Sequence, residues 1–393
     1  MTIEGVVLPP RPLRVAYVDH CAKLSGAEIA LLRLLPHLEG VEPVVVLGEE
    51  GPLVGRLNDK GIRTEVVPLP VATGTLGRER VAPGRLPLLS GAGAGLYSVQ
   101  LARRLRRLDV DIVHTNSNKA HLYGGVAARL ARRPQVWHAR DRVVPEFMPM
   151  AAVRLTRLAA RTLPRVVIAN SRSTLATLPA ARHPRGPSAV LPDPIVDPPV
   201  PRAGNERPFT VVMVGRLAPW KGQDVFLRSF AEAFGPASGQ SPARALVVGA
   251  ALFGEDDYAD ALRQLVEELG VSAQVVLTGH RDDVAAILAD ADVLVHASII
   301  PEPFGQVIVE GLLAGLPVVA ADAGGPAEIL DHERTGLLVP PRDVPRLAEA
   351  LLRLRHDPVL AARLVTAGRS AAEDYRPGPV ARQLEAVYHE VVA

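Results

Sequence analysis

Short apolar segments that resemble buried strands alternate with segments of helical periodicity, and this alternation runs twice along the 393-residue chain. Strand–helix alternation of this kind predicts parallel sheets covered by helices. In the first series we expect strands at Leu13–Val18, Pro43–Leu47, Thr64–Val67, Ile112–His114, Gln135–Trp137 and Val166–Ala169, and helices at Ala27–Leu38, Leu96–Leu108, His121–Ala131, Met150–Thr162 and Ser173–Leu178. In the second, we expect strands at Thr210–Val214, Ala245–Val248, Val275–Leu277, Val293–Val295 and Val318–Ala320, each followed by a helix.

The length of the chain favours two domains of about 190 residues each over one large core. A proline-rich stretch, residues 193–208, separates the two series and predicts a linker. We therefore expect an α/β protein with two Rossmann-like, doubly wound domains, at residues 1–195 and 196–375, and a last helix within 376–393. Doubly wound sheets bind ligands at the carboxyl ends of their strands, here expected in a cleft between the domains.

Composition excludes several classes of protein. A formal charge of +2 and an aromatic content of 4% give no argument for nucleic-acid binding. The single cysteine, Cys21, excludes an intrachain disulfide and fits a reducing compartment. No apolar run reaches the roughly 18–20 residues that span a bilayer, and the first twelve residues lack the pattern of a secretory signal. These features predict a cytoplasmic protein.

Two carboxylates, Glu302 and Glu310, flank a Pro-Phe-Gly sequence that follows an expected buried strand. The run after Gly305 is typical of a helix start, whose N–H groups favour phosphate. Glu302 on the loop could bind the hydroxyls of a sugar. The amides of Gly305 to Val307 could bind a diphosphate, and Glu310 could bind a ribose. Each Glu alone is equally typical of a solvated surface, so the spacing needs a second motif.

The second motif is a loop between an expected strand and helix, Gly215 to Gly222. It carries Arg216 and Lys221, two cations that could neutralise a leaving diphosphate. The chain has forty Arg but only four Lys, so a Lys between Trp220 and Gly222 is less typical of plain surface charge.

The chain resembles the retaining glycosyltransferases of family 4, which have the GT-B fold. The motifs that carry the resemblance are Gly-Arg-Leu with Lys221-Gly222, and Glu302-Pro-Phe-Gly with Glu310. The resemblance spans nearly the whole chain and includes residues 25–28, 137–141, 169–171 and 324–328. It implies transfer of a hexosyl or N-acetylhexosaminyl group from a nucleotide sugar, most simply a UDP-sugar, to a hydroxyl acceptor in glycan, glycolipid or natural-product synthesis. It also implies same-face attack with no protein nucleophile, and a last helix that crosses back to the first domain.

On this resemblance the expected site residues fall into three groups. The catalytic group is Arg216, Lys221, Glu302 and His138, of which His138 is expected at a strand end, in contact with the transferred sugar. The donor-binding group is Gly26, Gly215, His280, Phe304, Gly305, Gln306, Val307 and Glu310. Arg140 and Asp141 are candidates for the acceptor, with a mutual ion pair as the alternative.

No metal or other cofactor is expected. Metal-dependent transferases use an Asp-x-Asp pair, and Asp109-Val-Asp111 and Asp290-Ala-Asp292 match that spelling. Both lie where a helix gives way to a buried strand, so we interpret them as capping and solvation, and expect Arg216 and Lys221 to replace the metal. Two alternatives to a transferase stay open: a sugar-nucleotide 2-epimerase, and a non-catalytic subunit that binds a sugar nucleotide.

Two further segments are ambiguous. The segment Gly91-Ala-Gly-Ala-Gly95 follows Pro87 instead of a strand, so we reject a nicotinamide site and expect a loop over the acceptor cleft. Many arginines crowd the first domain, including four in residues 103–107 and three in 154–161. They fit either a solvated basic face or peripheral contact with the inner face of a membrane.

Overall fold

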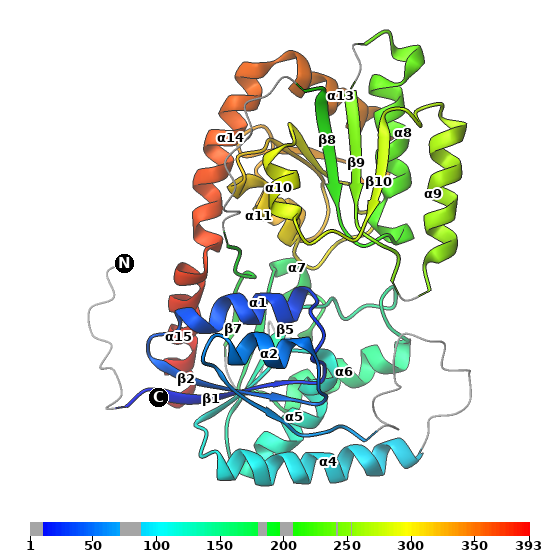
Figure 1. The fold of residues 1–393 in the computed structure, drawn as a ribbon. Coiled ribbons are helices and arrows are strands. Elements are labelled where there is room, and N and C mark those ends of the chain that lie inside the picture. The colour runs from blue at the N-terminus through cyan, green and yellow to red at the C-terminus, as the bar shows by residue number, and fades with distance from the viewer. Residues whose placement is uncertain (1–10, 71–87, 180–186, 197–206, 241–242, 253) are drawn as a thin grey trace. The chain divides into compact units, whose positions relative to one another are not determined.

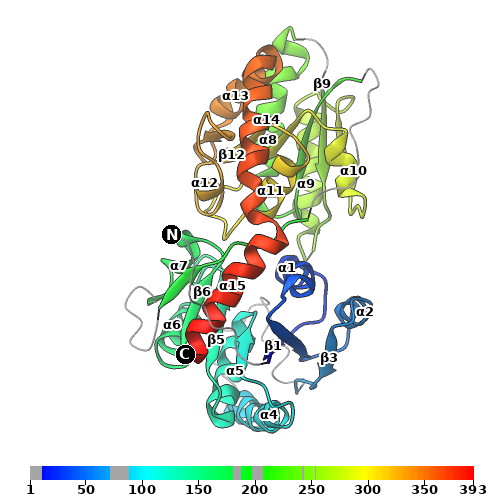
Figure 2. The same cartoon turned by 90° about the vertical axis from the view of Figure 1, so that its left-hand side faces the viewer.

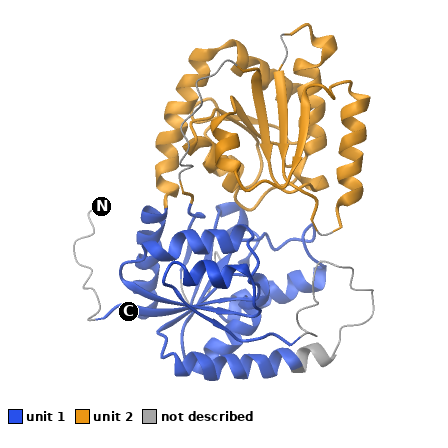
Figure 3. Ribbon diagram, viewed as in Figure 1, with its two compact units in different colours: residues 1–194, 377–393 blue, residues 195–376 orange. Residues whose placement is uncertain are grey.

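The computed structural model describes residues 11–70, 88–179, 187–196, 207–240, 243–252 and 254–393 (Figure 1). These divide into two compact units (Figure 3). Unit 1 comprises residues up to Pro194 together with Pro377–Ala393, and unit 2 comprises Ile195–Arg376. Most of the expected linker, residues 197–206, lies outside the described residues.

Unit 1 is a parallel seven-stranded sheet with the strand order β3-β2-β1-β4-β5-β6-β7. Its strands are β1 (Leu13–Asp19), β2 (Val41–Leu47), β3 (Arg63–Val66), β4 (Ile112–Thr115), β5 (Gln135–Ala139), β6 (Val166–Ala169) and β7 (Ser188–Val190). Its helices are α1 (Gly26–Leu34), α2 (Pro52–Asn58), α4 (Leu88–Arg107), α5 (Asn118–Ala131), α6 (Met150–Thr162), α7 (Arg172–Leu175) and α15 (Pro377–Val392), with a 3-10 turn at Leu35–His37.

Helices cover both faces of this sheet because its strands are apolar on both sides. On one face, α1, α2 and α15 bury residues such as Leu31, Leu53 and Leu384 against the sheet. On the other face, α4 and α5 pack against side chains such as Val18 and Val44. The last helix, α15, lies beside α1 (Figures 1 and 2), as expected for a helix that returns to the first domain.

Unit 2 is a parallel six-stranded sheet with the order β10-β9-β8-β11-β12-β13. Its strands are β8 (Phe209–Val214), β9 (Ala243–Val248), β10 (Val275–Gly279), β11 (Val293–His296), β12 (Val318–Ala321) and β13 (Leu337–Val339). Its helices are α8 (Gln223–Phe234), α9 (Asp256–Glu268), α10 (Val284–Ala289), α11 (Gln306–Leu313), α12 (Pro326–Ile329), α13 (Val344–His356) and α14 (Pro358–Ala372), with 3-10 turns at Pro219–Lys221, Pro236–Ser238 and Glu373–Tyr375. The prediction of two doubly wound α/β domains is confirmed.

Strand order reverses once in each sheet, between β1 and β4 in unit 1 and between β8 and β11 in unit 2. At such a switch point the loops after the two strands diverge to opposite faces and leave room for a ligand at their carboxyl ends. The two loops of unit 2 at this point carry the Gly215–Gly222 and Glu302–Glu310 motifs.

Some elements differ from those expected. The sequence analysis missed β7 and β13, both only three residues long. The segment Gly91–Gly95 lies inside α4, so the expectation of a loop there is wrong. Ala92 and Ala94 are good helix formers, and the apolar residues Tyr97 and Leu101 anchor the rest of α4 on the sheet, which outweighs the cost of isolated glycines. Among the described helices, none is both long and apolar enough to cross a membrane.

Candidate functional site

The loop after β8 reaches across to the end of β11 because Gly222 permits a very close approach. Gly222 has a φ of 75°, and a Cβ there would lie 2.1 Å from the carbonyl oxygen of Ala297. Only glycine fits such a position. The N–H of Ile299 also donates to the carbonyl of Trp220 at 2.9 Å. The Lys-Gly pair of the motif therefore places Lys221 beside the segment that follows β11.

Lys221 and Glu302, which the sequence placed in one site, form an ion pair. The Nζ of Lys221 donates to Oε1 of Glu302 at 2.6 Å, and the two side chains are 15% and 13% exposed. Oε2 of Glu302 lies 2.6 Å from Nε2 of His296 and accepts from Oγ of Ser298 at 2.8 Å. Both oxygens of this carboxylate are thus held by side chains that lie at the end of β11 or on the segments that follow β8 and β11.

These contacts keep Glu302 ionised. Burial alone would raise the pKa of Glu302, but the charges of Lys221 and His296 and their hydrogen bonds lower it well below the ordinary value. Sequence reasoning missed His296 and Ser298. The sequence feature that could have identified them is their position at the end of a buried strand, directly before the loop that carries Glu302.

The second cation, Arg216, also lies near the ring of Trp220. Nζ of Lys221 is 4.5 Å from the centre of the Trp220 ring, and Cζ of Arg216 is 6.0 Å from it. NH1 of Arg216 contacts both oxygens of Glu255 at 2.8 Å. Each cation of the motif therefore has a carboxylate partner, and Glu255, which directly precedes α9, was not foreseen.

Backbone contacts with the Gly324-Gly325 pair fix the loop that carries Glu302. The N–H of Gly325 donates to the carbonyl of Glu302 at 2.8 Å. Gly324 has a φ of 70°, and a Cβ there would lie 2.4 Å from the same carbonyl oxygen. Helix α11 then begins at Gln306, after Gly305 in a left-handed conformation. The first N–H groups of a helix have no acceptor within it, which suits an anion.

The other expected donor-binding residues of unit 2 lie at varied distances from this cluster. The ring of Phe304 is buried in the core, with its centroid 5.8 Å from that of the Tyr375 ring. Glu310 lies half-buried in α11, five residues or about one and a half turns beyond Gly305. His280 follows β10 at the edge of the sheet and is exposed, paired with Asp282 at 3.3 Å.

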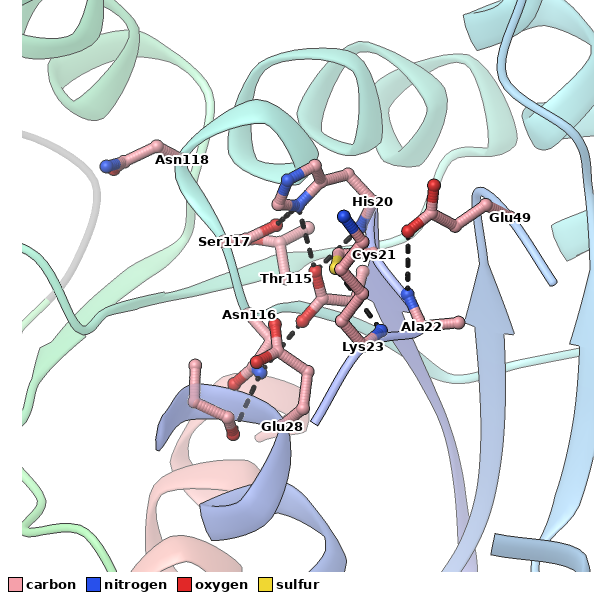
Figure 4. A network of polar contacts seen from close by, with 12 residues as sticks. His20, Cys21, Ala22, Lys23, Glu28, Glu49, Thr115, Asn116, Ser117 and Asn118 are labelled. Atoms are coloured by element: carbon pink, nitrogen blue, oxygen red, sulfur yellow. Dashed lines mark hydrogen bonds and ion pairs between the residues drawn. The ribbon is translucent and has the colours of Figure 1, made fainter. Parts of the chain in front are cut away.

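A buried polar network occupies the switch point of unit 1 (Figure 4). Asp19, the last residue of β1, contacts His20 and accepts from Nδ2 of Asn116 at 2.9 Å. Ser25 donates to Glu28 in the first turn of α1, which begins at the expected donor residue Gly26. Burial and the neighbouring charge of Asp19 raise the pKa of Glu28, whereas the hydrogen bonds of His20 and Asn116 outweigh burial and lower that of Asp19.

His138, by contrast, is buried inside unit 1. Its Nδ1 lies 3.2 Å from Nε2 of His114, whose Nδ1 is 2.8 Å from the hydroxyl of Tyr388 in α15. Burial, with the nearby charge of Arg140, lowers the pKa of His114 to about 3 and that of His138 well below its ordinary value. Both rings are therefore neutral. His138 lies near the carboxyl end of β5, where it was expected, but the residue is only 1% exposed. Its contact with a sugar stays a prediction.

Arg140 does not pair with Asp141. It is buried, forms an ion pair with Asp193 and donates from Nε to Oδ1 of Asn116 at 2.8 Å. Asp141 accepts from Nδ2 of Asn118 at 3.2 Å. The alternative of a mutual Arg140–Asp141 pair is wrong, because Asp193, to which the sequence analysis gave no role, competes for the guanidinium from beyond β7.

The two Asp-x-Asp sequences connect neighbouring strands. Asp111 accepts from the N–H of Arg14 at 2.9 Å and pairs with Arg11. Asp292 accepts from the N–H of Thr210 at 2.8 Å and pairs with Arg207. Both carboxylates therefore satisfy the start of an adjacent strand. Within the part of the chain that the structure describes, no three His, Cys, Asp or Glu side chains are grouped as metal ligands.

Comparison with known proteins identifies the family. Residues 26–197 match the family model described as Glycosyltransferase Family 4, and residues 200–371 match Glycosyl transferases group 1. A GDP-mannose-dependent alpha-mannosyltransferase of Mycobacterium tuberculosis is 32% identical over 91% of this chain and 93% of its own length. The crystal structure of Anabaena HepE in complex with UDP-glucose superposes with a TM-score of 0.80 at 27% identity, over 96% of this chain and all of that one.

Other relatives match over shorter stretches. An exopolysaccharide phosphotransferase of Streptomyces coelicolor is 33% identical over 47% of this chain, and the match covers 19% of the length of that protein. A GDP-mannose-dependent phosphatidylinositol monomannoside mannosyltransferase of M. tuberculosis is 37% identical over 42% of this chain, and 43% of its own length is covered. The motifs, the two doubly wound sheets and the match along nearly the whole mannosyltransferase agree: the chain belongs to the glycosyltransferases of family 4, which have the GT-B fold.

Proposed function

We propose that the protein is a retaining glycosyltransferase that moves a hexosyl group from a nucleotide sugar to a hydroxyl acceptor. The observation that carries this proposal is the Lys221–Glu302–His296 cluster at the switch point of unit 2. It combines a cation, an ionised carboxylate and the start of α11 at the carboxyl ends of β8 and β11. A nucleotide sugar offers the matching groups: sugar hydroxyls, a diphosphate and a ribose.

Each residue then has a role that its chemistry suits. Lys221 and Arg216 stabilise the charge that develops on the departing diphosphate, and the amides of Gln306 and Val307 bind its oxygens. Glu302 accepts hydrogen bonds from the sugar hydroxyls, and Glu310 binds the ribose. His280 contributes backbone contacts to the base. His138 contacts the transferred sugar, and Arg140 acts indirectly, through the groups that it holds.

The ionised state of Glu302 favours electrostatic stabilisation over acid catalysis. A carboxylate whose pKa lies well below the ordinary value has no proton to give to a leaving group at neutral pH. Its negative charge instead stabilises a cation-like sugar ring. The acceptor hydroxyl attacks on the face from which the diphosphate departs and passes its proton to the leaving phosphate, so no protein nucleophile forms a covalent intermediate.

The identity of the donor is testable with a panel. The long-matched relative is named for GDP-mannose and the crystallised neighbour binds UDP-glucose. The sequence analysis expected a UDP-sugar, and we place GDP-mannose beside UDP-glucose as the two leading donors. Slow hydrolysis of one of them, with release of its nucleoside diphosphate and acceleration by an acceptor, is the expected result.

The panel also separates the alternatives. A sugar-nucleotide 2-epimerase turns over its donor without any acceptor effect, and a binding subunit releases no diphosphate. A product whose anomeric configuration, read by NMR, is inverted relative to the donor would contradict the retaining mechanism.

We expect activity without a metal ion. The fixed charges of Lys221 and Arg216 at the site supply what a divalent cation supplies elsewhere. A chelator such as EDTA should leave turnover within about two-fold of the untreated rate, a change below 0.5 kcal/mol in activation free energy. Strong inhibition that magnesium reverses would contradict this assignment.

We also propose peripheral contact with an anionic membrane through α5 and α6. Leu155 and Leu158 of α6 are 55% and 61% exposed, and Val126 and Leu130 of α5 are exposed as well. Arg129 of α5 donates to the carbonyl of Thr162 at 3.4 Å and so joins the two helices.

Neither of these helices contains an Asp or Glu. Arg154 and Arg161, which flank the two leucines, have no ion-pair partner among the described residues. Exposed leucines among uncompensated arginines suit the interface of an anionic bilayer.

Flotation with vesicles tests this contact. The protein should float with vesicles that contain phosphatidylglycerol and not with phosphatidylcholine alone, because each arginine near an anionic surface contributes about 1 kcal/mol. Leu155→Ser/Leu158→Ser should lose binding at least about ten-fold, since burying one leucine stabilises by about 1.5–3 kcal/mol. Val359→Ser, at the 77% exposed Val359 of unit 2, is the matched control and should float normally. Equal loss in both variants would remove α6 from the interface.

A further inference from the structure

The switch point of unit 1 presents a histidine in a position that matches the donor cluster of unit 2. Val18 of β1 pairs with Thr115 of β4, so the residues that follow, His20 and Ser117, leave neighbouring strands at the same edge of the sheet. In a doubly wound sheet this is the place where a ligand binds. Unit 2 has Lys221, Glu302 and His296 at the equivalent point. The sequence analysis gave a ligand-binding role to Gly26, at the start of α1, and none to His20 or Ser117.

The ring of His20 is held in place by contacts at its Nδ1 atom. The ring atom Nδ1 lies 2.8 Å from Oγ of Ser117 and 3.2 Å from Oδ1 of Asp19. The backbone N–H of His20 donates to the same oxygen of Asp19 at 2.7 Å. The side chain of Asp19 is 0% exposed and that of His20 is 30% exposed. Because the ionised carboxylate of Asp19 can only accept a hydrogen bond, we assign the proton of the neutral His20 ring to Nδ1. Nε2 then carries the lone pair and has no hydrogen-bond partner among the residues described.

The support of this histidine extends across the sheet. Asn116 donates to Asp19 and accepts from Arg140, which in turn pairs with Asp193. Buried side chains at the end of β1 and after β4, β5 and β7 thus form one chain of contacts that ends at His20. Ser117 adds to it, because as the N-cap residue of α5 it uses its hydroxyl on His20 instead of capping the helix.

We infer that His20 is an acceptor-binding residue, whose Nε2 accepts a hydrogen bond from the hydroxyl of a pyranoside acceptor. The inference rests on the proposed function, because it assigns the hydroxyl substrate to unit 1. His20 orients this hydroxyl and takes no proton from it, since the leaving phosphate of the donor accepts that proton. A bond of this kind, held by a rigid partner, raises the local concentration of the correctly oriented hydroxyl.

Three variants test the inference. His20→Ala removes the ring, His20→Gln keeps a polar group near the position of Nε2, and His37→Ala is the control at an exposed histidine on the 3-10 turn after α1. The acceptor probes are methyl α-glycosides of mannose, glucose, galactose and N-acetylglucosamine. The readouts are acceptor-independent hydrolysis of the donor, acceptor-dependent release of nucleoside diphosphate, and the ¹⁵N resonance of the His20 Nε2, assigned with His20→Gln.

The expected pattern is specific to an acceptor contact. His20→Ala should raise the KM for the glycoside about ten-fold, in the range of one lost hydrogen bond. It should leave donor hydrolysis within two-fold of the unaltered protein, an activation change below about 0.5 kcal/mol. His20→Gln should recover most of the acceptor affinity, His37→Ala should change neither rate, and the Nε2 resonance should move as the glycoside is added.

Three results would overturn the inference. One is a panel in which no glycoside moves the Nε2 resonance or accelerates donor turnover. Another is an unchanged acceptor KM in His20→Ala. The third is an equal decrease in the rates of donor hydrolysis and of transfer in His20→Ala, because a residue with a purely structural role would lower both rates alike. Failure of the proposed function is distinguishable, because it shows as absent diphosphate release in the unaltered protein.

Discussion

Lys221→Ala is expected to lower turnover by about 10²–10³-fold. A fixed charge beside a departing diphosphate acts where negative charge develops, and losing one such group typically costs about 3–4 kcal/mol of transition-state stabilisation. In this protein the change also leaves Oε1 of Glu302 without its cation, so a second negative charge faces the leaving group uncompensated. The fall should appear in kcat, measured by diphosphate release under saturating donor.

Three further variants serve as controls for this prediction. Lys60→Ala removes another of the four lysines, an exposed one after α2, and should retain full turnover. Glu302→Gln keeps the shape of the side chain and removes its charge. Because Lys221 and Glu302 contact each other, the double variant Lys221→Ala/Glu302→Gln should lose less than the two single losses combined. Turnover near the unaltered rate in Lys221→Ala would remove this lysine from the site.

The sequence predicted the architecture and those motifs in which a glycine adopts a backbone conformation that other residues rarely adopt. Runs such as Val44–Val46 and Val293–Val295 are apolar on both faces of a strand, which only a sheet covered on both sides can bury. Gly222 could be singled out because its neighbour Lys221 is rare in this chain. Its physical reason, the approach to Ala297, needed the coordinates.

Partners from distant segments could not be predicted. Glu255 pairs with Arg216 from 39 residues away, and Asp193 pairs with Arg140 from 53 residues away. Neither acid has a local pattern that separates it from surface carboxylates. The buried contacts of His138 begin with His114 of β4, which in turn contacts Tyr388 of α15, 274 residues farther along the chain. Such pairings are set by strand order, and strand order is not visible in periodicity.

The second large effect is expected at the Arg140–Asp193 pair, in stability and not in chemistry. The two side chains are 5% and 4% exposed. Removing one member of a buried ion pair leaves a charge that water cannot reach, and this typically costs about 3–5 kcal/mol. Asp193→Ala should therefore lower the melting temperature of unit 1 by about 10 °C, at about 2–4 °C per kcal/mol for a domain of this size. Scanning calorimetry of the full chain measures this shift.

Asp260→Ala is the matched control, because Asp260 forms an ion pair with Arg263 that is largely exposed. Exposed pairs contribute about 0–1 kcal/mol, so that variant should melt within about 3 °C of the unaltered protein. Arg140→Met/Asp193→Leu tests the cause, since an apolar pair of similar volume removes the uncompensated charge and should recover much of the loss. Equal melting of Asp193→Ala and Asp260→Ala would show that Arg140 finds water or another partner. If instead Asp193→Ala destabilises and the apolar pair restores stability without restoring acceptor affinity, the buried charges serve mainly to hold the Asp19–His20 edge of the sheet in place.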